Sequence, residues 1–377
     1  MRAITSSRGG QVPIAWRQLA SEPAKVAVTV LAVAAAVALV LLLSGLRRGI
    51  GEQVTLYIDR QPPVLVAQAG ARDFLAQTSV LPETLGERLE RVPGVSEATP
   101  ISQQFAMLTL HERRVLAILI GYDPGKAGGP WRLASGRAPN ASGELVLDRV
   151  VASDHGLRIG STLSYRGARL RIVGLSSGTS GFMTPLAFAT RQTTNALRRQ
   201  PGSANFFLVQ PDSGVTPEAL TGRIEREVPG VSALTRDEVA ANDRGLFATV
   251  FSKILLPMVA IAFAVAILVI GLAVYTSTAE RSREYATLKA LGLRRFALFR
   301  LVGVQAASLA FAGTLVGTLL GFAAARGISA LAPRYLVSIG PETVAVVAVS
   351  ALAMATVAAL LPARFVARVD PATAFRR

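Results

Sequence analysis

Four uncharged, apolar stretches divide this chain, and they are placed asymmetrically. The first lies near the N-terminus and the other three lie close together in the last third, at residues 26–46, 254–279, 301–325 and 343–363. Each is long enough to cross about 30 Å of hydrocarbon as a helix that rises ~1.5 Å per residue. A mostly polar segment, residues 47–253, separates the first stretch from the second. The layout predicts an α-helical membrane protein with four transmembrane helices and one large α+β domain outside the membrane.

The positive charge is concentrated beside the apolar stretches. The net charge is +16, but residues 47–253 hold 24 Lys/Arg and 19 Asp/Glu, whereas the remainder holds 16 and 5. This distribution is a topology signal rather than a nucleic-acid footprint. The positive-inside rule places residues 1–25, 280–300 and 364–377 in the cytoplasm. Residues 47–253 and the short loop 326–342 then lie outside, which we expect to be the periplasmic side of a bacterial inner membrane.

The large domain contains a weak internal repeat. Residues 82–92 and 217–228 each begin with proline, show helical apolar spacing and are followed by the sequence Pro-Gly-Val-Ser. Each follows a short apolar run, residues 64–67 and 206–209, and a strand is expected after each as well. Two βαβ-like units would pair into one lobe close to the membrane. The alternative is a chance resemblance between two amphipathic patterns.

The middle of the domain has a different pattern. Short strands flanked by turn residues are expected at 143–148 and 170–175, and Ser176–Gly181 is expected to be a flexible loop. We therefore predict two lobes, which are a membrane-proximal lobe of residues 60–125 plus 201–245 and a β-rich lobe of residues 126–200.

The chain has no common catalytic motif. Asp154 and His155 lie near several serines, so composition alone leaves a hydrolytic triad open, but a lone histidine is more often structural and neither histidine is expected to be catalytic. It has no cysteine and two histidines, His111 and His155, so a multi-histidine metal site is excluded. The nearest approach to a phosphate-binding P-loop, Gly121–Ala127, is one residue short and has Ala in place of Ser/Thr. The four apolar stretches contain no Asp, Glu, Lys, Arg or His, which weighs against ion-coupled transport. We expect a non-catalytic protein without a cofactor of its own, supplied with energy from elsewhere.

A stripe of glycines marks the third apolar stretch. Gly313, Gly317 and Gly321 recur every four residues and form a smooth helix face that lets another helix approach closely. Glycine is common in membrane helices, but three in register favour helix packing. The partner helix could belong to this chain or to another subunit.

The loop after the second apolar stretch has the pattern of a short helix. Residues 282–291 favour helix, with Tyr285, Leu288 and Leu291 on one face, and Gly292 can cap its C-terminal end. A solvated linker is the alternative, but a linker would not need apolar residues on one face. We therefore predict a cytoplasmic docking surface.

At this loop the sequence resembles the MacB/FtsX-like permease family of ABC transporters. The matching residues are Arg281, Glu284, Tyr285, Ala286, Leu288, Lys289, Ala290, Leu291 and Gly292. The tail Asp370–Arg376 also resembles the family, as does Ile14–Leu19 in the N-terminal segment, which we expect to be amphipathic. Weaker resemblances lie in the large domain at Ser135–Arg137, Gly143–Leu147 and Gly156–Ser161. Many relatives carry a glutamate early in the third stretch where this chain has Gln305.

The resemblance implies a permease subunit that works with a separate cytoplasmic ABC ATPase dimer, which would bind ATP and magnesium. The residues implied in coupling are Glu280, Arg281, Arg283, Glu284, Tyr285, Leu288, Lys289, Leu291 and Gly292. Gly313, Gly317, Gly321 and Gln305 would serve helix packing or dimerisation with a second copy or a paralogous permease. ATP hydrolysis would move the periplasmic domain to export or extract a lipophilic substrate or lipoprotein from membrane lipid, with a periplasmic adaptor as a further partner. The alternative is mechanical signalling to a periplasmic or cell-wall hydrolase.

Overall fold

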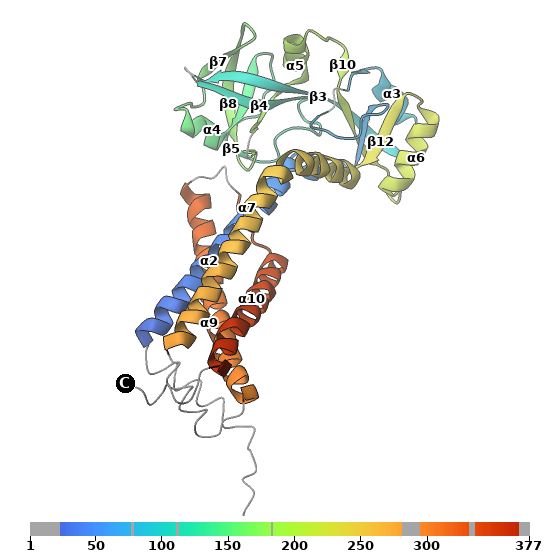
Figure 1. The fold of residues 1–377 in the computed structure, drawn as a ribbon. Coiled ribbons are helices and arrows are strands. Elements are labelled where there is room, and N and C mark those ends of the chain that lie inside the picture. Colours follow the sequence, from blue (N-terminus) through green and yellow to red (C-terminus); the bar gives the residue numbers. More distant parts are fainter. Residues whose placement is uncertain are drawn as a thin grey trace, which may run out of the picture. The chain divides into compact units, whose positions relative to one another are not determined.

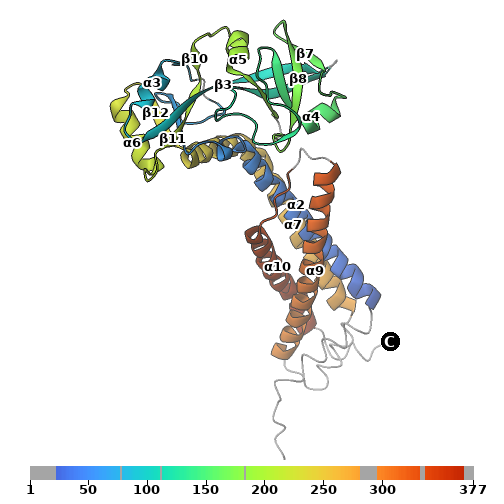
Figure 2. The same ribbon diagram turned by 180° about the vertical axis from the view of Figure 1, so that it is seen from behind.

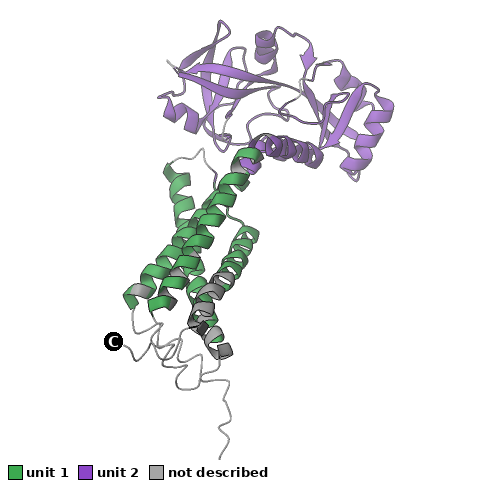
Figure 3. Ribbon diagram, viewed as in Figure 1, with its two compact units in different colours: residues 1–49, 253–331, 337–377 green, residues 50–252, 332–336 purple. Residues whose placement is uncertain are grey.

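The computed structural model describes residues 23–76, 79–110, 113–181, 184–280, 295–331 and 336–368. The chain divides into two compact units (Figure 3). Unit 1 comprises residues 1–49, 253–331 and 337–377, and unit 2 comprises residues 50–252 and 332–336. Several predicted features lie outside the described residues, namely Ile14–Leu19, His111, the loop helix 282–291 with its coupling residues from Arg281 to Gly292, and the tail motif Asp370–Arg376.

Four long helices contribute to unit 1, and each is longer than the apolar stretch from which it was predicted. They are α2 (Pro23–Val54), α7 (Arg236–Glu280), α9 (Arg295–Leu331) and α10 (Pro341–Arg368). The apolar stretches locate only the parts of these helices that suit hydrocarbon. The α2 helix continues past Leu46, and α7 begins well before Ile254.

The four helices share one apolar core and also expose apolar side chains on their outer faces. Small and branched residues fill the core, among them Val37 and Leu41 of α2, Ala266 of α7, Ala310 of α9 and Ala351 of α10. The exposed set includes Leu31, Ile261, Leu268, Phe311, Leu315, Val346 and Val349. Exposed apolar side chains on every helix suit a lipid surrounding better than water.

Two of the described helical segments are long and apolar enough to cross a membrane, Val26–Val54 and Gly303–Leu331. The helices α7 and α10 contain shorter apolar segments, Leu256–Val269 and Pro341–Met354. Apolar helices near the N-terminus and in the C-terminal region are thus present, and the count of four spans stays a prediction.

Unit 2 is built on a ten-stranded sheet in the order β12-β1-β11-β3-β4-β9-β6-β8-β5, with β7 pairing β3 and β8. The strands are β1 (Val64–Gln68), β3 (Val95–Leu110), β4 (Arg113–Tyr122), β5 (Leu133–Gly136), β6 (Glu144–Asp148), β7 (Thr162–Tyr165), β8 (Ala168–Ser176), β9 (Leu186–Thr190), β11 (Phe206–Pro211) and β12 (Val231–Thr235). A small second sheet pairs β2 (Leu81–Pro82) with β10 (Ser203–Ala204). The helices are α3 (Leu85–Glu90), α4 (Arg149–Asp154), α5 (Arg191–Arg198) and α6 (Pro217–Glu227), with a 3-10 turn η1 (Ile58–Arg60).

The sequence repeat corresponds to two split β-α-β units whose strands interleave. In one unit α3 lies between β1 and β3, and in the other α6 lies between β11 and β12. Both β11 and β12 pair antiparallel with β1, so β11 separates β1 from β3. Leu89 of α3 and Ile224 of α6 are buried in one core with Phe207, and both helices lie at the same end of the sheet (Figures 1 and 2).

The two predicted lobes are parts of one sheet, and the boundary lies inside β3 rather than after residue 125. The first half of β3, to Ile101, pairs with β11, and the second half, from Ser102, pairs with β4. Because β4 pairs with β9, residues 102–122 belong structurally with the β-rich half.

The prediction of a flexible loop at Ser176–Gly181 was wrong. Ser176 and Thr179 are fully buried, and their hydroxyl oxygens are 2.6 Å apart. The Thr179 hydroxyl also donates to Asp148 Oδ2 at 2.6 Å, while Asp148 Oδ1 accepts from the N–H of Val150 and caps α4. The buried carboxylate therefore fixes the loop, an interaction that the composition of the loop does not reveal.

Candidate functional site

The glycine stripe of α9 packs on α2 of the same chain. A Cβ atom on Gly313 would lie 2.5 Å from Cγ1 of Val33, and one on Gly317 would lie 2.6 Å from the carbonyl oxygen of Ala34. Both distances are too short for a real Cβ, so the close approach of the two helices requires glycine. Gln305, earlier on α9, is buried with 6% of its surface exposed.

The C-terminal part of α2 is also tied to the segment that leads into α10. The N–H of Ser338 donates to the carbonyl oxygen of Gly45 at 3.0 Å. Arg48 forms an ion pair with Glu342 at 3.2 Å, and because Glu342 is 83% exposed the pair contributes little. These contacts fix the turn before α10 against α2.

The predicted coupling residues lie between two described helices. Glu280 is the last residue of α7, and α9 begins at Arg295. The remaining coupling residues, Arg281 to Gly292, lie outside the described part of the chain, so their role stays a prediction.

An apolar cavity of about 220 Å³ lies inside unit 2. One wall is the end of α2 with the following turn, another is the part of α7 that carries Phe247 and Phe251, and a third is the sheet. The lining residues are Ile50, Gln53, Val54, Leu56, Tyr57, Phe74, Leu75, Leu116, Ile118, Gly181, Thr184, Leu186, Phe247 and Phe251. Phe247 and Phe251 lie one helical turn apart and stack with ring centroids 4.3 Å apart. Carbon surface from three elements therefore surrounds a space suited to an apolar group.

Buried polar contacts hold two of the lining aromatics. Tyr57 stacks on Phe74 with centroids 5.0 Å apart, and its hydroxyl donates to the carbonyl oxygen of Gly128 at 3.1 Å. Burial raises the pKa of Tyr57, so the hydroxyl keeps its proton and remains a donor. The backbone N–H groups of Phe74 and Leu75 both donate to Asp243 Oδ1 at 3.1 Å.

Asp243 is the titratable group behind this wall. Its side chain is on α7 and is fully buried. Burial raises its pKa to about 7, the two backbone hydrogen bonds oppose that rise, and the nearby Asp73 adds to it. The attachment of the 74–75 segment to α7 therefore depends on a carboxyl group that titrates near neutral pH.

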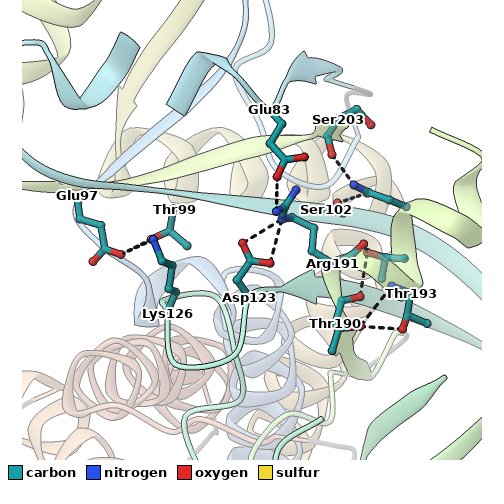
Figure 4. Close-up of polar contacts among 12 residues, drawn as sticks. Glu83, Glu97, Thr99, Ser102, Asp123, Lys126, Thr190, Arg191, Thr193 and Ser203 are labelled. Atoms are coloured by element: carbon teal, nitrogen blue, oxygen red, sulfur yellow. Dashed lines mark hydrogen bonds and ion pairs between the residues drawn. The ribbon is translucent and has the colours of Figure 1, made fainter. Parts of the chain in front are cut away.

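A second polar cluster joins the two halves of the sheet (Figure 4). The guanidinium of Arg191, at the start of α5, donates to Asp123, which directly follows β4, with Nε 3.1 Å from Oδ2. Its Nη2 also donates to Glu83, which precedes α3. The hydrogen bond from Arg191 lowers the pKa of Glu83, although partial burial opposes this. Close by, Ser102 donates to Asn195, whose amide donates to the carbonyl oxygen of Ser203.

Neither histidine was expected to be catalytic, and the described one has a structural position. His155 follows α4, and its Nδ1 lies 2.9 Å from the carbonyl oxygen of Val151. The contact is local to the helix end.

The sequence did not predict the apolar cavity or the polar cluster. A partial signal for the cavity was available, because Phe247 and Phe251 are spaced by one turn just before the second apolar stretch. The other walls come from segments far apart in the chain.

Comparison with known proteins agrees with this architecture. Residues 26–227 match the MacB-like periplasmic core domain, and residues 257–371 match the FtsX-like permease C-terminal domain. An uncharacterized ABC transporter permease of Mycobacterium tuberculosis is 24% identical over 367 residues, covering 96% of this chain and 98% of that protein. Another, from Mycobacterium bovis, is 28% identical over 350 residues, covering 90% and 91%.

Two solved structures are also similar. The periplasmic region of MacB from Actinobacillus actinomycetemcomitans has a TM-score of 0.37 at 13% identity, covering 48% of this chain and 91% of that one. The extracellular domain of YknZ from Gram-positive bacteria has a TM-score of 0.37 at 11% identity, covering 46% and 98%.

The family matches cover both the α+β domain and the C-terminal helices. The chain belongs to the MacB/FtsX-like family of ABC transporter permeases. Unit 2 is accordingly its extracytoplasmic domain.

Proposed function

We propose that this chain is the permease subunit of a bacterial inner-membrane ABC transporter and exports or extracts a lipophilic substrate or lipoprotein. A separate cytoplasmic ATPase dimer would bind the 281–292 loop and supply the energy. A second copy or a paralogous permease would complete the transporter, and a periplasmic adaptor is a further expected partner. Both termini would be cytoplasmic, as the distribution of basic residues favours.

The observation that best supports a lipophilic substrate is the apolar cavity of the external domain. Its wall begins at Ile50 of α2, about one helical turn along the same helix from Leu46, where the apolar stretch ends. The lining offers an acyl chain apolar side chains from α2, α7 and the sheet within the external domain. A volume of about 220 Å³ is enough for part of an acyl chain rather than a whole lipid.

Continuous helices favour motion as the means of transport. The α2 helix runs across the boundary between the units at residues 49 and 50, and α7 runs across the boundary at residues 252 and 253. A displacement of the part of α7 near the coupling loop would be passed along one continuous helix, in which Pro257 removes a single backbone hydrogen bond. The same continuity supports the second candidate, mechanical signalling to a periplasmic hydrolase.

The substrate proposal is tested by placing a charge in the cavity. Leu116 lines it and is 37% exposed, whereas Leu133 on β5 is equally exposed and lies away from it. In nanodiscs that contain the permease and its ATPase, Leu116→Arg should abolish photo-crosslinking of the domain to a lipid with a reactive acyl chain. Leu133→Arg should leave the crosslinking unchanged. Equal crosslinking in both variants would contradict the proposal.

The two candidate functions predict different effects of ATP hydrolysis. Transport predicts ATP-dependent loss of the crosslinked lipid from the membrane fraction. Signalling predicts ATP-dependent activity of a bound hydrolase with no lipid movement, and that result would replace the transport proposal.

A further inference from the structure

A second cavity, of about 280 Å³, lies at a gap in the pairing of β3. The first half of β3 pairs with β11 as far as Ile101, and β7 meets the same strand at Thr109. Between these positions the N–H of Gln103 donates to the side chain of Asn205 at 2.7 Å instead of to a strand. The cavity is therefore a notch at a strand edge, distinct from the apolar cavity although Leu75 contributes to both.

Three residues that line this notch each carry a buried side-chain nitrogen with no hydrogen-bond partner among the described residues. The three atoms are Nε2 of Gln103, Nε2 of Gln104 and Nη1 of Arg198. The other terminal nitrogen of Arg198, Nη2, donates to Oε1 of Gln200. Gln103 is 91% buried, because 9% of its surface is exposed. A buried donor without a partner costs about 1–3 kcal/mol, so three in one notch indicate that an acceptor is missing.

The surroundings are positively charged. Arg166 also lines the notch and forms part of an adjoining cavity of about 690 Å³, where it is joined by Arg169 and Arg199. No aspartate or glutamate occurs among the described residues that line either cavity. Burial lowers the pKa of Arg198, as expected for a cation that lacks a counter-ion in this part of the structure.

The backbone holds two of these arginines in an unusual conformation. Arg166 (φ 50°) and Arg199 (φ 58°) are the two non-glycine residues with positive φ in the described part of the chain. Both residues adopt the left-handed conformation, which favours glycine or asparagine, and Arg199 does so as the C-cap of α5. Arg166 is further fixed by donating Nη1 to the carbonyl oxygen of Leu197 at 3.1 Å.

We propose that the notch lined by Gln103, Gln104 and Arg198 binds a phosphate group carried on an organic molecule. The donors come from β3 and from the end of α5, with Arg166 on the β7–β8 turn. Donors from three separate elements suit the several oxygens of a tetrahedral phosphate better than a planar carboxylate. The volume exceeds that of a phosphate alone, and the half-exposed ring of Phe105 on the rim provides apolar contact for the carrier.

The test uses the full-length permease in phosphatidylcholine nanodiscs, with glycerol 3-phosphate and inorganic phosphate as probes and sodium chloride holding the ionic strength constant. Isothermal titration calorimetry should show saturable binding of glycerol 3-phosphate. Arg198→Gln should weaken it at least tenfold. Arg114→Gln, which removes the same charge from an exposed position of β4 outside the notch, should change it less than twofold. Equal effects of both variants, or heat no greater than that of chloride, would overturn the proposal.

A measurement of thermal stability tests the proposal separately, in case a variant loses binding because it is misfolded. Gln103→Leu removes an unpaired donor while keeping a similar volume, so it should raise the melting temperature without ligand and abolish the rise caused by glycerol 3-phosphate. A lower melting temperature without ligand would show that Gln103 already has a partner and would refute the site. Repeating the titration in nanodiscs that contain phosphatidylglycerol identifies the source. If phosphatidylglycerol weakens the binding of glycerol 3-phosphate, the ligand of the notch is a lipid headgroup. If the binding is undiminished, the ligand is a soluble phosphate ester.

Discussion

Gly317 of α9 lies directly against Ala34 of α2, so closely that a Cβ on the glycine would be 2.6 Å from the alanine carbonyl oxygen. Backbone atoms cannot move aside as a flexible side chain can. The contact therefore makes α2 and α9 a packed pair within one chain and occupies the glycine face that could otherwise contact a second copy.

Gly317→Leu should separate α2 from α9 and lower the thermal stability of the helical unit, with a loss above about 2 kcal/mol as expected for overpacking against backbone. Gly327→Ala, on the same helix with open space around it, is the control and should be neutral or slightly stabilising. Thermal unfolding in detergent followed by circular dichroism distinguishes them. If Gly317→Leu instead dissociates a dimer and leaves unfolding unchanged, the stripe serves an intermolecular contact.

Asp243 should make the external domain less stable as the pH rises from about 4 to about 7. Its pKa is raised from 3.8 to about 7, so over this range the folded state holds a proton that the unfolded state has released. The contribution of this proton is complete at low pH and is lost as the pH rises through the folded pKa, with a total on the order of 4 kcal/mol. Asp243→Asn should flatten the slope between these pH values.

The fluorescence of Trp131, which packs against the core of unit 2, can follow this unfolding after the other tryptophan is changed by Trp16→Phe. An unchanged pH slope in Asp243→Asn would show that another group is responsible.

Arg191→Met should weaken the connection between the two halves of the sheet. The substitution leaves Glu83 and Asp123 facing each other without the guanidinium between them. Because both carboxylates keep 34–41% exposure, the loss should fall below the roughly 3–5 kcal/mol of a fully buried pair. Arg91→Met is the control, since Arg91 pairs with Glu87 at the surface and should contribute less than about 0.5 kcal/mol. Equal losses of urea stability in the two variants would contradict a bridging role.

Leu288→Glu should prevent co-purification of the partner ATPase, because a charge would replace the middle residue of the predicted apolar docking face. Thr287→Glu introduces the same charge one residue away, off the face formed by Tyr285, Leu288 and Leu291, and should leave the complex intact. Retention of the ATPase by both variants would favour a solvated linker.

The start of α7 shows which part of a helix the sequence predicts and which part it does not. The apolar stretch begins at residue 254, but the helix begins at Arg236 because polar residues can continue a helix that an apolar window cannot detect. A local signal was present. Thr235 and Glu238 form a capping box, in which the N–H of Glu238 donates to the Thr235 hydroxyl at 3.2 Å and the N–H of Thr235 donates to the Glu238 carboxylate at 2.8 Å.

Long-range arrangements had no comparable signal. The repeat predicted both helices α3 and α6, but the insertion of β11 between β1 and β3 depends on pairing between segments more than 100 residues apart. The phosphate notch depends on side chains from β3, α5 and a hairpin turn, each ordinary within its own segment. Local patterns determine the elements, whereas the sites arise where distant elements meet.

The strand β3 runs unbroken for 16 residues through both halves of the external domain. Its two halves are joined by continuous strand backbone rather than by a flexible hinge. They therefore cannot rotate as separate bodies without distorting the strand. Occupancy of the notch beside Gln103 should therefore slow amide exchange in β11 as well as in β4. A ligand bound at the middle of the sheet would stiffen it from edge to edge.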